Sequence, residues 1–232
     1  MIHRIRILLP LLSICIALPA AAATLHVPGD YPDIQTAVIM ALDGDTVLVA
    51  DGTWTGTGNI SVYLFTGYTI TIRSENGPAN CIIDCEDENN AFNIWWGDGP
   101  DTVIRGFTIR NGFDRDGAGI DIEASSPTIT DCRFEHCWAY YRGGSIAVEG
   151  GAPVITDCSF TDGRAAFGGA VAILGESDPL IGGEGHGNRF EGNDAGVGMD
   201  LYCDTPHTPP IAATHNSFSG CPQSGFYVSP PE

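Results

Sequence analysis

A ten-residue phrase occurs twice in this chain, as SSPTITDCRF at 125–134 and as GAPVITDCSF at 151–160, with Pro127 and Pro153 26 positions apart. A glycine-led apolar alternation precedes each phrase and recurs a third time, as GAGIDIEASSP (117–127), GGSIAVEGGAP (143–153) and GGAVAILGESDP (168–179). A unit this short cannot bury its apolar face alone. Repeats of this period therefore stack into a solenoid with one shared core.

The repeats read as short strands, because their apolar residues alternate with a period of two, as in Ile120/Ile122, and β-branched residues and glycine are frequent. Gly143-Gly144 and Gly168-Gly169 mark the corners where the chain bends. In a parallel stack, equal positions of neighbouring coils lie about 4.8 Å apart. We therefore predict an all-β solenoid in which Ile120, Ile146 and Val171 form one column.

The first 23 residues have the order of a secretory signal peptide: a basic start, an apolar run from Ile7 to Leu18, then small residues. The run is too short to span a bilayer, and no second run of suitable length follows, so we expect no membrane span. Leu12-Ser13-Ile14-Cys15 resembles a lipoprotein box, but Ile14 stands where a small residue is required before the acylated Cys15. We expect a released mature chain, 24–232, in the periplasm or outside the cell.

The chain is strongly acidic. It has no lysine, and removal of Arg4 and Arg6 with the leader leaves eight arginines against 29 acidic residues, a balance of −21. Such a surface repels nucleic acid and anionic membranes, so neither is expected as a partner. It also disfavours an anionic polymer such as pectate unless divalent cations bridge the two. Solubility in an extracellular setting explains the acidity without any specific partner.

Residues 31–42 are predicted to form an amphipathic helix. Ile34, Ala37, Val38 and Ala41 fall at helical spacing after a turn-like segment. A helix here would cover the open end of the stack, where unpaired strand groups would otherwise attract another chain.

Several segments together carry a family resemblance: HVPGDYPDIQTAVIMALDGDTVLVADGTW (26–54), VIRGFTIRNG, the paired-glycine corners and the PxITDCxF strands. The chain resembles the right-handed parallel β-helix proteins of the pectin-lyase-like superfamily, in particular secreted bacterial members of unassigned function. The resemblance covers essentially the whole mature chain. It implies coils of three short parallel strands, an N-terminal capping helix, and an asparagine ladder at the positions occupied here by Asp131 and Asp157.

Seven cysteines remain after the leader is removed, namely Cys81, Cys85, Cys132, Cys137, Cys158, Cys203 and Cys221. The odd number leaves at least one thiol free or paired between chains. Cys132 and Cys158 occupy equal positions on parallel strands, which favours packed thiols over a bridge. Cys81 and Cys85 point to one face, too far apart to bond. A Cys203–Cys221 disulfide is the pairing we expect.

The acidic segment DCEDENN has the oxygen ligands that Ca²⁺ prefers, on Asp84, Glu86, Asp87 and Glu88, but its spacing fits no defined calcium loop. Solvated turns explain it better, and no cofactor is expected. Asp131 and Asp157 stack and would repel each other unless they share a proton or a cation. Capping of turn amides is the simpler role for both side chains.

Enzymes on this fold include lyases, hydrolases with paired aspartates, and esterases. The candidate catalytic residues here are weak: Arg105, Asp131, Asp157 and His186. His186 lies in a GHG sequence that resembles polygalacturonase-type hydrolases, but their NTD and DD motifs are missing, and no GxSxG motif occurs. An enzyme would require Asp84, Asp87 and Arg105, or a similar set, to converge in one groove.

Aromatic residues are the other candidate site. Trp95, Trp96, Trp138, Tyr140 and Tyr141 stand beside turns, and strand alternation predicts that one of Trp95 and Trp96 faces the core and the other looks outward. Flat rings among polar side chains are a common means of binding sugar. The alternative is that Trp138 and Tyr140 cover the apolar underside of a loop.

These observations favour a secreted, non-catalytic β-helix module, expected to be a monomer, that binds polysaccharide or a cell-surface partner along its outer face. A carbohydrate-active enzyme, either a lyase or a hydrolase with a divergent site, is the first alternative. A structural part of an exported assembly is the second, and it predicts self-association that light scattering would detect.

Overall fold

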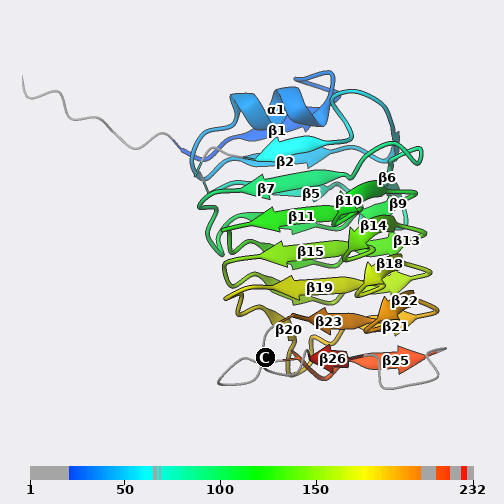
Figure 1. The fold of residues 1–232 in the computed structure, drawn as a ribbon. Coiled ribbons are helices and arrows are strands. Elements are labelled where there is room, and N and C mark those ends of the chain that lie inside the picture. Colours follow the sequence, from blue (N-terminus) through cyan, green and yellow to red (C-terminus); the bar gives the residue numbers. More distant parts are fainter. Residues whose placement is uncertain (1–20, 65–66, 68, 205–212, 220–225, 229–232) are drawn as a thin grey trace, which may run out of the picture.

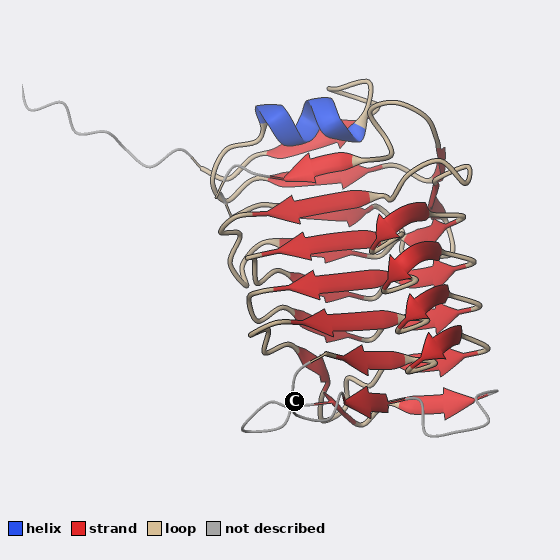
Figure 2. Ribbon diagram, in the orientation of Figure 1, coloured by secondary structure: helices blue, strands red, loops and turns tan. Residues whose placement is uncertain are grey.

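The computed structural model describes residues 21–64, 67, 69–204, 213–219 and 226–228. The predicted leader therefore lies almost entirely outside the described residues, as do Cys15 and Cys221. In this described part, short parallel strands are stacked in successive coils, and its single short helix lies at the N-terminal end (Figures 1 and 2).

Every strand in the described residues belongs to one of four parallel sheets, which are numbered here in the order in which a coil passes through them. Sheet 1 contains β1 (Thr24–Val27), β2 (Thr46–Val49), β5 (Thr71–Ser74), β8 (Val103–Arg105), β12 (Thr128–Thr130), β16 (Val154–Thr156), β20 (Leu180–Gly182) and β24 (Ala213–Thr214). Sheet 2 contains β3 (Gly52–Trp54), β6 (Cys81–Asp84), β9 (Thr108–Arg110), β13 (Arg133–Glu135), β17 (Ser159–Thr161), β21 (Arg189–Glu191) and β25 (Ser217–Ser219).

The remaining two sheets complete each coil. Sheet 3 is short and contains β10 (Phe113–Asp116), β14 (Trp138–Arg142), β18 (Arg164–Phe167) and β22 (Asp194–Val197). Sheet 4 contains β4 (Val62–Leu64), β7 (Phe92–Trp95), β11 (Ile120–Glu123), β15 (Ile146–Glu149), β19 (Val171–Leu174), β23 (Leu201–Cys203) and β26 (Phe226–Val228).

The predicted column is confirmed. Ile120 pairs with Ile146, and Ile146 with Val171, as direct partners on adjacent parallel strands. All three side chains are fully buried. Alternation along each strand sends one set of residues into a core that runs the length of the stack. The fold is therefore the predicted parallel solenoid, with equal positions of successive coils in register.

The predicted capping helix is present but shorter than 31–42. Helix α1 (Ile34–Met40) lies over β1 at the N-terminal end (Figure 1). Its expected inner face is confirmed, because Ile34, Ala37, Val38 and Ala41 are all buried. Asp33 caps its first turn by accepting a hydrogen bond from the Thr36 backbone N–H at 2.7 Å. Strands at this end are thus covered rather than open.

The expectation of three strands per coil is wrong for four coils, to which sheet 3 adds a fourth strand as β10, β14, β18 and β22. Its corner with sheet 4 is the paired-glycine corner. Gly143 has a φ of +63°, in the left-handed region that favours glycine. A Cβ on the next residue, Gly144, would lie 2.0 Å from the Gly169 carbonyl oxygen. These glycines let the chain turn tightly after β14, so that this short strand fits between sheets 2 and 4.

The asparagine ladder is displaced by one residue from its expected position. Asp131 and Asp157 adopt left-handed φ values of 53° and 54°. Their carboxylates lie beside Arg105 and His186, and among the described residues no turn amide donates to either, so the expected capping role is wrong. Asn188 instead continues the inward column of Cys132 and Cys158. Its Oδ1 accepts from the Cys158 N–H at 2.9 Å and its Nδ2 donates to the Ile155 carbonyl at 2.8 Å. An inward side chain at this position can bond to buried backbone groups of the neighbouring coil, such as the Cys158 N–H, that would otherwise have no partner.

The cysteines contribute to the core. Cys132 and Cys158 are buried and unbridged, as expected for stacked thiols. Cys81 and Cys85 are also buried, unbridged and on one face. Burial raises the pKa of the Cys137 thiol to about 12, so it stays uncharged and unreactive at neutral pH. Cys203 is buried, and the predicted partner Cys221 lies outside the described residues.

Candidate functional site

The outer face of sheet 4 begins with a row of rings. Tyr63 on β4 and Trp95 on β7 both point outward, and their rings meet edge to face at 5.3 Å between centroids. Trp96 follows with a φ of +62° and a side chain that is 68% exposed. The prediction that one tryptophan faces the core is therefore wrong. Strand alternation turns Trp95 outward, and the left-handed backbone at Trp96 turns the next ring outward as well.

Sheet 3 carries the other candidate rings. Trp138, Tyr140 and Tyr141 on β14 are 55%, 74% and 40% exposed. Between its paired positions, β14 has one residue more than its neighbours β10 and β18, which is a β-bulge. The bulge explains why Tyr140 and Tyr141 are both exposed although they are consecutive in a strand. The Trp138 ring also contacts the ring of Phe113 on β10 at 5.3 Å.

Charged side chains lie where the two sheets meet. Arg142 donates from Nε to Asp116 at 2.9 Å and from Nη2 to the same carboxylate at 3.2 Å. Its Nη2 also lies 3.5 Å from Glu149 of sheet 4, and its guanidinium lies 5.3 Å from the centre of the Tyr141 ring. This bidentate ion pair fixes a cation between the sheets. The five candidate rings thus lie on two adjoining sheets, with an ion-pair cluster at their junction.

Asp121 of β11 lies in the same junction, and sequence reasoning missed it. Its Oδ2 accepts a hydrogen bond from the Trp95 indole at 3.2 Å. The pKa of the Asp121 carboxyl is raised to about 7, mainly by burial and in part by the nearby Glu123, Asp116 and Asp114, against the lowering effect of the Trp95 hydrogen bond. The alternation of GIDIE indicates that Asp121 points outward. Its burial could not be read from the sequence because it depends on sheet 3, which was not predicted.

Replacing Asp121 by asparagine should change how stability depends on pH. An aspartate in the unfolded chain ionises near 3.8, whereas the folded pKa is about 7. Between these values the folded protein holds a proton that the unfolded chain has lost, so the free energy of unfolding falls as pH rises. Asp121→Asn removes this loss. Relative to the wild type, we expect the free energy of unfolding of the variant to rise by about a few kcal/mol between about pH 4 and 7. Urea unfolding at a series of pH values measures this difference.

The matched control is Asp194→Asn, which removes one carboxylate at an exposed position of β22. The stability advantage of Asp121→Asn over wild type should grow with pH through that window and level off above it. An advantage that is constant with pH, or that grows equally in the control, would contradict the assignment of a buried protonated carboxyl.

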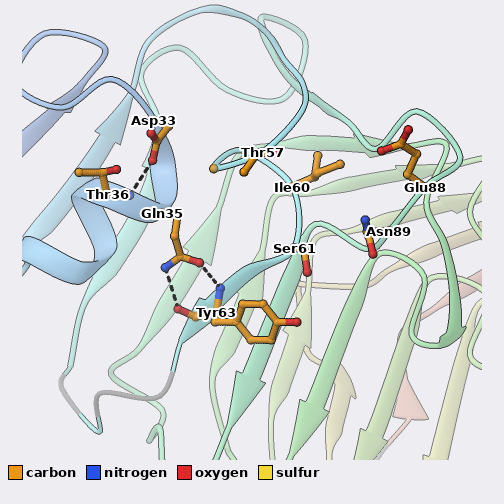
Figure 3. Close-up of a pocket in the computed structure, with 10 residues that line it drawn as sticks. Asp33, Gln35, Thr36, Thr57, Ile60, Ser61, Tyr63, Glu88 and Asn89 are labelled. Carbon is orange, nitrogen blue, oxygen red and sulfur yellow. Dashed lines mark hydrogen bonds between the residues drawn. The ribbon is translucent and has the colours of Figure 1, made fainter.

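A cavity of about 490 Å³ lies at the N-terminal end of this face, beside α1. Figure 3 shows residues from three segments around it: the start of α1, the segment that leads into β4, and the loop before β7. Its lining consists of Asp33, Gln35, Thr36, Thr57, Gly58, Ile60, Ser61, Tyr63, Glu88 and Asn89. Tyr63 therefore belongs both to this cavity and to the row of rings on sheet 4.

A second cavity, of about 410 Å³, lies at the corner between sheets 2 and 3. Trp138 and Arg164, which are direct partners on β14 and β18, form part of its wall. His136 and Asp162 also line it, and the His136 Nδ1 lies 3.6 Å from an Asp162 oxygen. The exposed Trp138 ring thus borders a polar hollow.

The four candidate catalytic residues lie together at the corner between sheets 1 and 2. Arg105 Nε is 3.9 Å from Asp131 Oδ2, and His186 Nδ1 is 2.8 Å from Asp157 Oδ2. All four side chains are between 40% and 66% exposed. Each carboxylate thus has a basic partner, and because both pairs are exposed to water they contribute little to the stability of the fold. This corner is separate from the aromatic face.

The acids proposed for calcium are divided among different partners. Asp84 binds Arg110 at 2.8 Å and Asn111 at 2.9 Å. Asp87 lines the cavity beside Trp138, whereas Glu88 lines the one beside α1. Within the described part of the chain, no group of three His, Cys, Asp or Glu side chains is arranged to hold a metal ion. Asp84 and Asp87 lie at one corner, where both bond to Asn111, whereas Arg105 lies at the corner between sheets 1 and 2 beside Asp131. These three residues therefore do not converge in one groove as an enzyme would require.

Four parallel sheets around one core, with an aromatic outer face, define this molecule as a parallel β-solenoid. The chain belongs to the right-handed β-helix family, whose model, described as a right handed beta helix region, matches residues 37–192 and 72–230. Comparison with curated proteins and with solved structures gave no match. The fold supports a polysaccharide-related or a structural role. In the described residues, no helix is long and apolar enough to cross a membrane.

Proposed function

We propose that this protein is an exported β-helix module that binds a polysaccharide, or a glycan of a cell-surface partner, on the outer face of sheets 3 and 4 without cleaving it. The observation that supports this function is the gathering of exposed rings on two adjoining sheets around a fixed ion-pair cluster. Trp96 and Tyr141 are the rings chosen to test this binding, because both are exposed and one directly follows sheet 4 strand β7 and the other lies on sheet 3 strand β14.

The chemistry of the face suits a sugar polymer. Sugar rings present C–H groups that pack on aromatic faces, and hydroxyls that bond to carboxylates and guanidinium groups. Tyr63, Trp95 and Trp96 form a continuous series of ring contacts along one edge of the face. Arg142 and Asp116 supply fixed polar groups next to Tyr141. The acidic charge of the chain favours a neutral polymer over an anionic one.

Substitution of the rings tests the proposal. Trp96→Ala and Tyr141→Ala should each weaken binding by about tenfold, because each removes a stacking platform of an extended ligand. The measurement is affinity gel electrophoresis against soluble neutral glucans, mannans, galactans and xylans, followed by calorimetric titration of the polymer that is retained. An acidic polymer with and without Ca²⁺ completes the panel.

Leu180→Ala is the matched control. Leu180 is an exposed apolar residue, but it belongs to sheet 1 and lies away from the rings. Its removal should leave retention unchanged. The proposal is wrong if the wild type is retained by no polymer, or if the two ring variants bind as well as the Leu180 variant.

Asp121 gives one reason to keep a hydrolase as a second candidate. A carboxyl whose pKa is raised to about 7, with the carboxyls of Asp116 and Glu123 nearby, resembles the acid of the acid and base pair of glycosidases. Release of new reducing ends from the retained polymer, with loss of that release in Asp121→Asn, would establish this alternative. The structural alternative would show as self-association in light scattering of the mature chain.

A further inference from the structure

We propose that the cavity beside α1 binds the terminal sugar of a neutral glycan chain, so that the protein recognises chain ends rather than internal segments. This inference rests on the proposed function, because the cavity is the end of the same face. The term "terminal cavity" is used below for the hollow lined by Asp33, Gln35, Thr36, Thr57, Gly58, Ile60, Ser61, Tyr63, Glu88 and Asn89.

The terminal cavity continues the row of rings. Tyr63 lies on β4, the N-terminal edge strand of sheet 4, and its ring touches that of Trp95 at 5.3 Å. Trp95 in turn contacts Trp96 at 5.9 Å. A sugar chain packed on the tryptophans would therefore place its next unit against Tyr63. That unit would lie in the terminal cavity, whose volume of about 490 Å³ is within the range of small-ligand sites.

Helix α1 is held rigidly at the far side of the cavity. The Gln35 side chain binds both backbone groups of Tyr63: Nε2 donates to the carbonyl at 3.3 Å, and Oε1 accepts from the N–H at 2.8 Å (Figure 3). The Gln35 N–H also donates to the Gly58 carbonyl at 2.8 Å. Gln35 thus completes the edge of sheet 4 in place of another strand. A bound chain cannot extend past this point without displacing the helix.

The lining explains why a neutral sugar fits. The side chains of Thr36, Thr57, Glu88 and Asn89 line the cavity and have no hydrogen-bond partner among the described residues. These groups offer donors and acceptors for several sugar hydroxyls. Asp33 and Glu88 add negative charge, and no Arg or His lines the cavity. A uronate or a sulfated sugar would meet like charge here, whereas an uncharged sugar would not.

Filling the cavity is the direct test. Thr57→Trp places a large ring in the opening from an exposed loop position, and Thr55→Trp places the same ring at an exposed position that does not line the cavity. The probe is a six-sugar fragment of the neutral polymer that the wild type retains best. We expect Thr57→Trp to weaken its binding at least tenfold in calorimetric titration, on the scale of one lost subsite. Thr55→Trp should bind as the wild type does.

Chain length provides a second measurement. The retained polymer is cut into shorter pieces of the same sugar, and binding capacity is compared at equal sugar mass. Recognition of ends predicts that capacity rises in proportion to the number of chain ends. Recognition of internal segments predicts equal capacity at every length above the site size, and this result would overturn the inference.

A charge change provides a third measurement if the added tryptophan disturbs the loop. Glu88→Arg should increase the affinity for a fragment oxidised to a carboxylate at its ends by several-fold, whereas Glu86→Arg, with the same change of charge outside the cavity, should not. Retention of the polymer with no effect of either cavity variant would reject the terminal site alone. Absence of retention by the wild type would instead reject the proposed function together with this inference.

Discussion

Phe160→Ala should lower the free energy of unfolding by about 3–5 kcal/mol, as expected for removal of a fully buried aromatic side chain. Phe134, Phe160 and Phe190 are direct partners on three successive strands of sheet 2. Their rings are stacked at 4.9 Å between centroids, with interplanar angles of 5° and 10°. Alanine in the middle would leave a void between two rings that the rigid coil spacing prevents from closing. Urea unfolding followed by circular dichroism measures the change.

Phe113→Ala is the control, because it removes the same side chain from β10, where the ring is 37% exposed. Its cost should be well below that of Phe160→Ala, since much of this ring is already in contact with water. Equal costs for the two variants would show that the stacked phenylalanines do not form a continuous core.

Gly144→Ala should lower the free energy of unfolding by a similar amount, ~3 kcal/mol or more. We also expect it to reduce the yield of folded protein. The added Cβ would lie 2.0 Å from the Gly169 carbonyl oxygen and 2.6 Å from the Arg164 backbone nitrogen. Both are backbone atoms of the next coil, so no side chain can move aside. The coils would have to separate at the corner that joins sheets 3 and 4. Soluble yield and thermal unfolding measure the effect.

Gly183→Ala is the comparison for this substitution. A Cβ on Gly183 would meet no atom within 4 Å, and its φ lies outside the left-handed range. Its stability should stay within about 0.5 kcal/mol of the wild type, as for an ordinary surface change. If Gly144→Ala were equally well tolerated, the close approach of backbones at the paired-glycine corner would be wrong.

Much of the fold could be predicted because each signal was local. Alternation in the repeated segments identified Ile120, Ile146 and Val171 as inward residues, and their constant spacing put them in one column. Helical spacing placed Ile34 and Val38 on the inner face of α1. These predictions required only the side-chain periods of strand and helix and the fact that short units bury their apolar faces by stacking.

The candidate site was only partly predictable. The rings were found from their types and their positions beside turns, but the inward orientation expected for one tryptophan failed at Trp96, where the backbone is left-handed. Sheet 3 was missed because four-residue segments such as Phe113–Asp116 alternate between exposed and half-buried residues and carry no apolar signal. Asp121 was missed as a consequence, since its burial depends on that sheet.

The sequence by itself determined the solenoid, its register and the inward column of each strand. Apolar residues that alternate with a period of two in repeated short segments are buried together only when the segments stack in register. Tertiary structure alone decided which outward residues share a surface. Trp95 and Asp121 lie 26 positions apart and meet because adjacent coils stack. Arg142 of sheet 3 meets Glu149 of sheet 4 because a bulged strand folds against the next sheet. Burial and pKa depend on all neighbours in space, and no local period of the sequence encodes them.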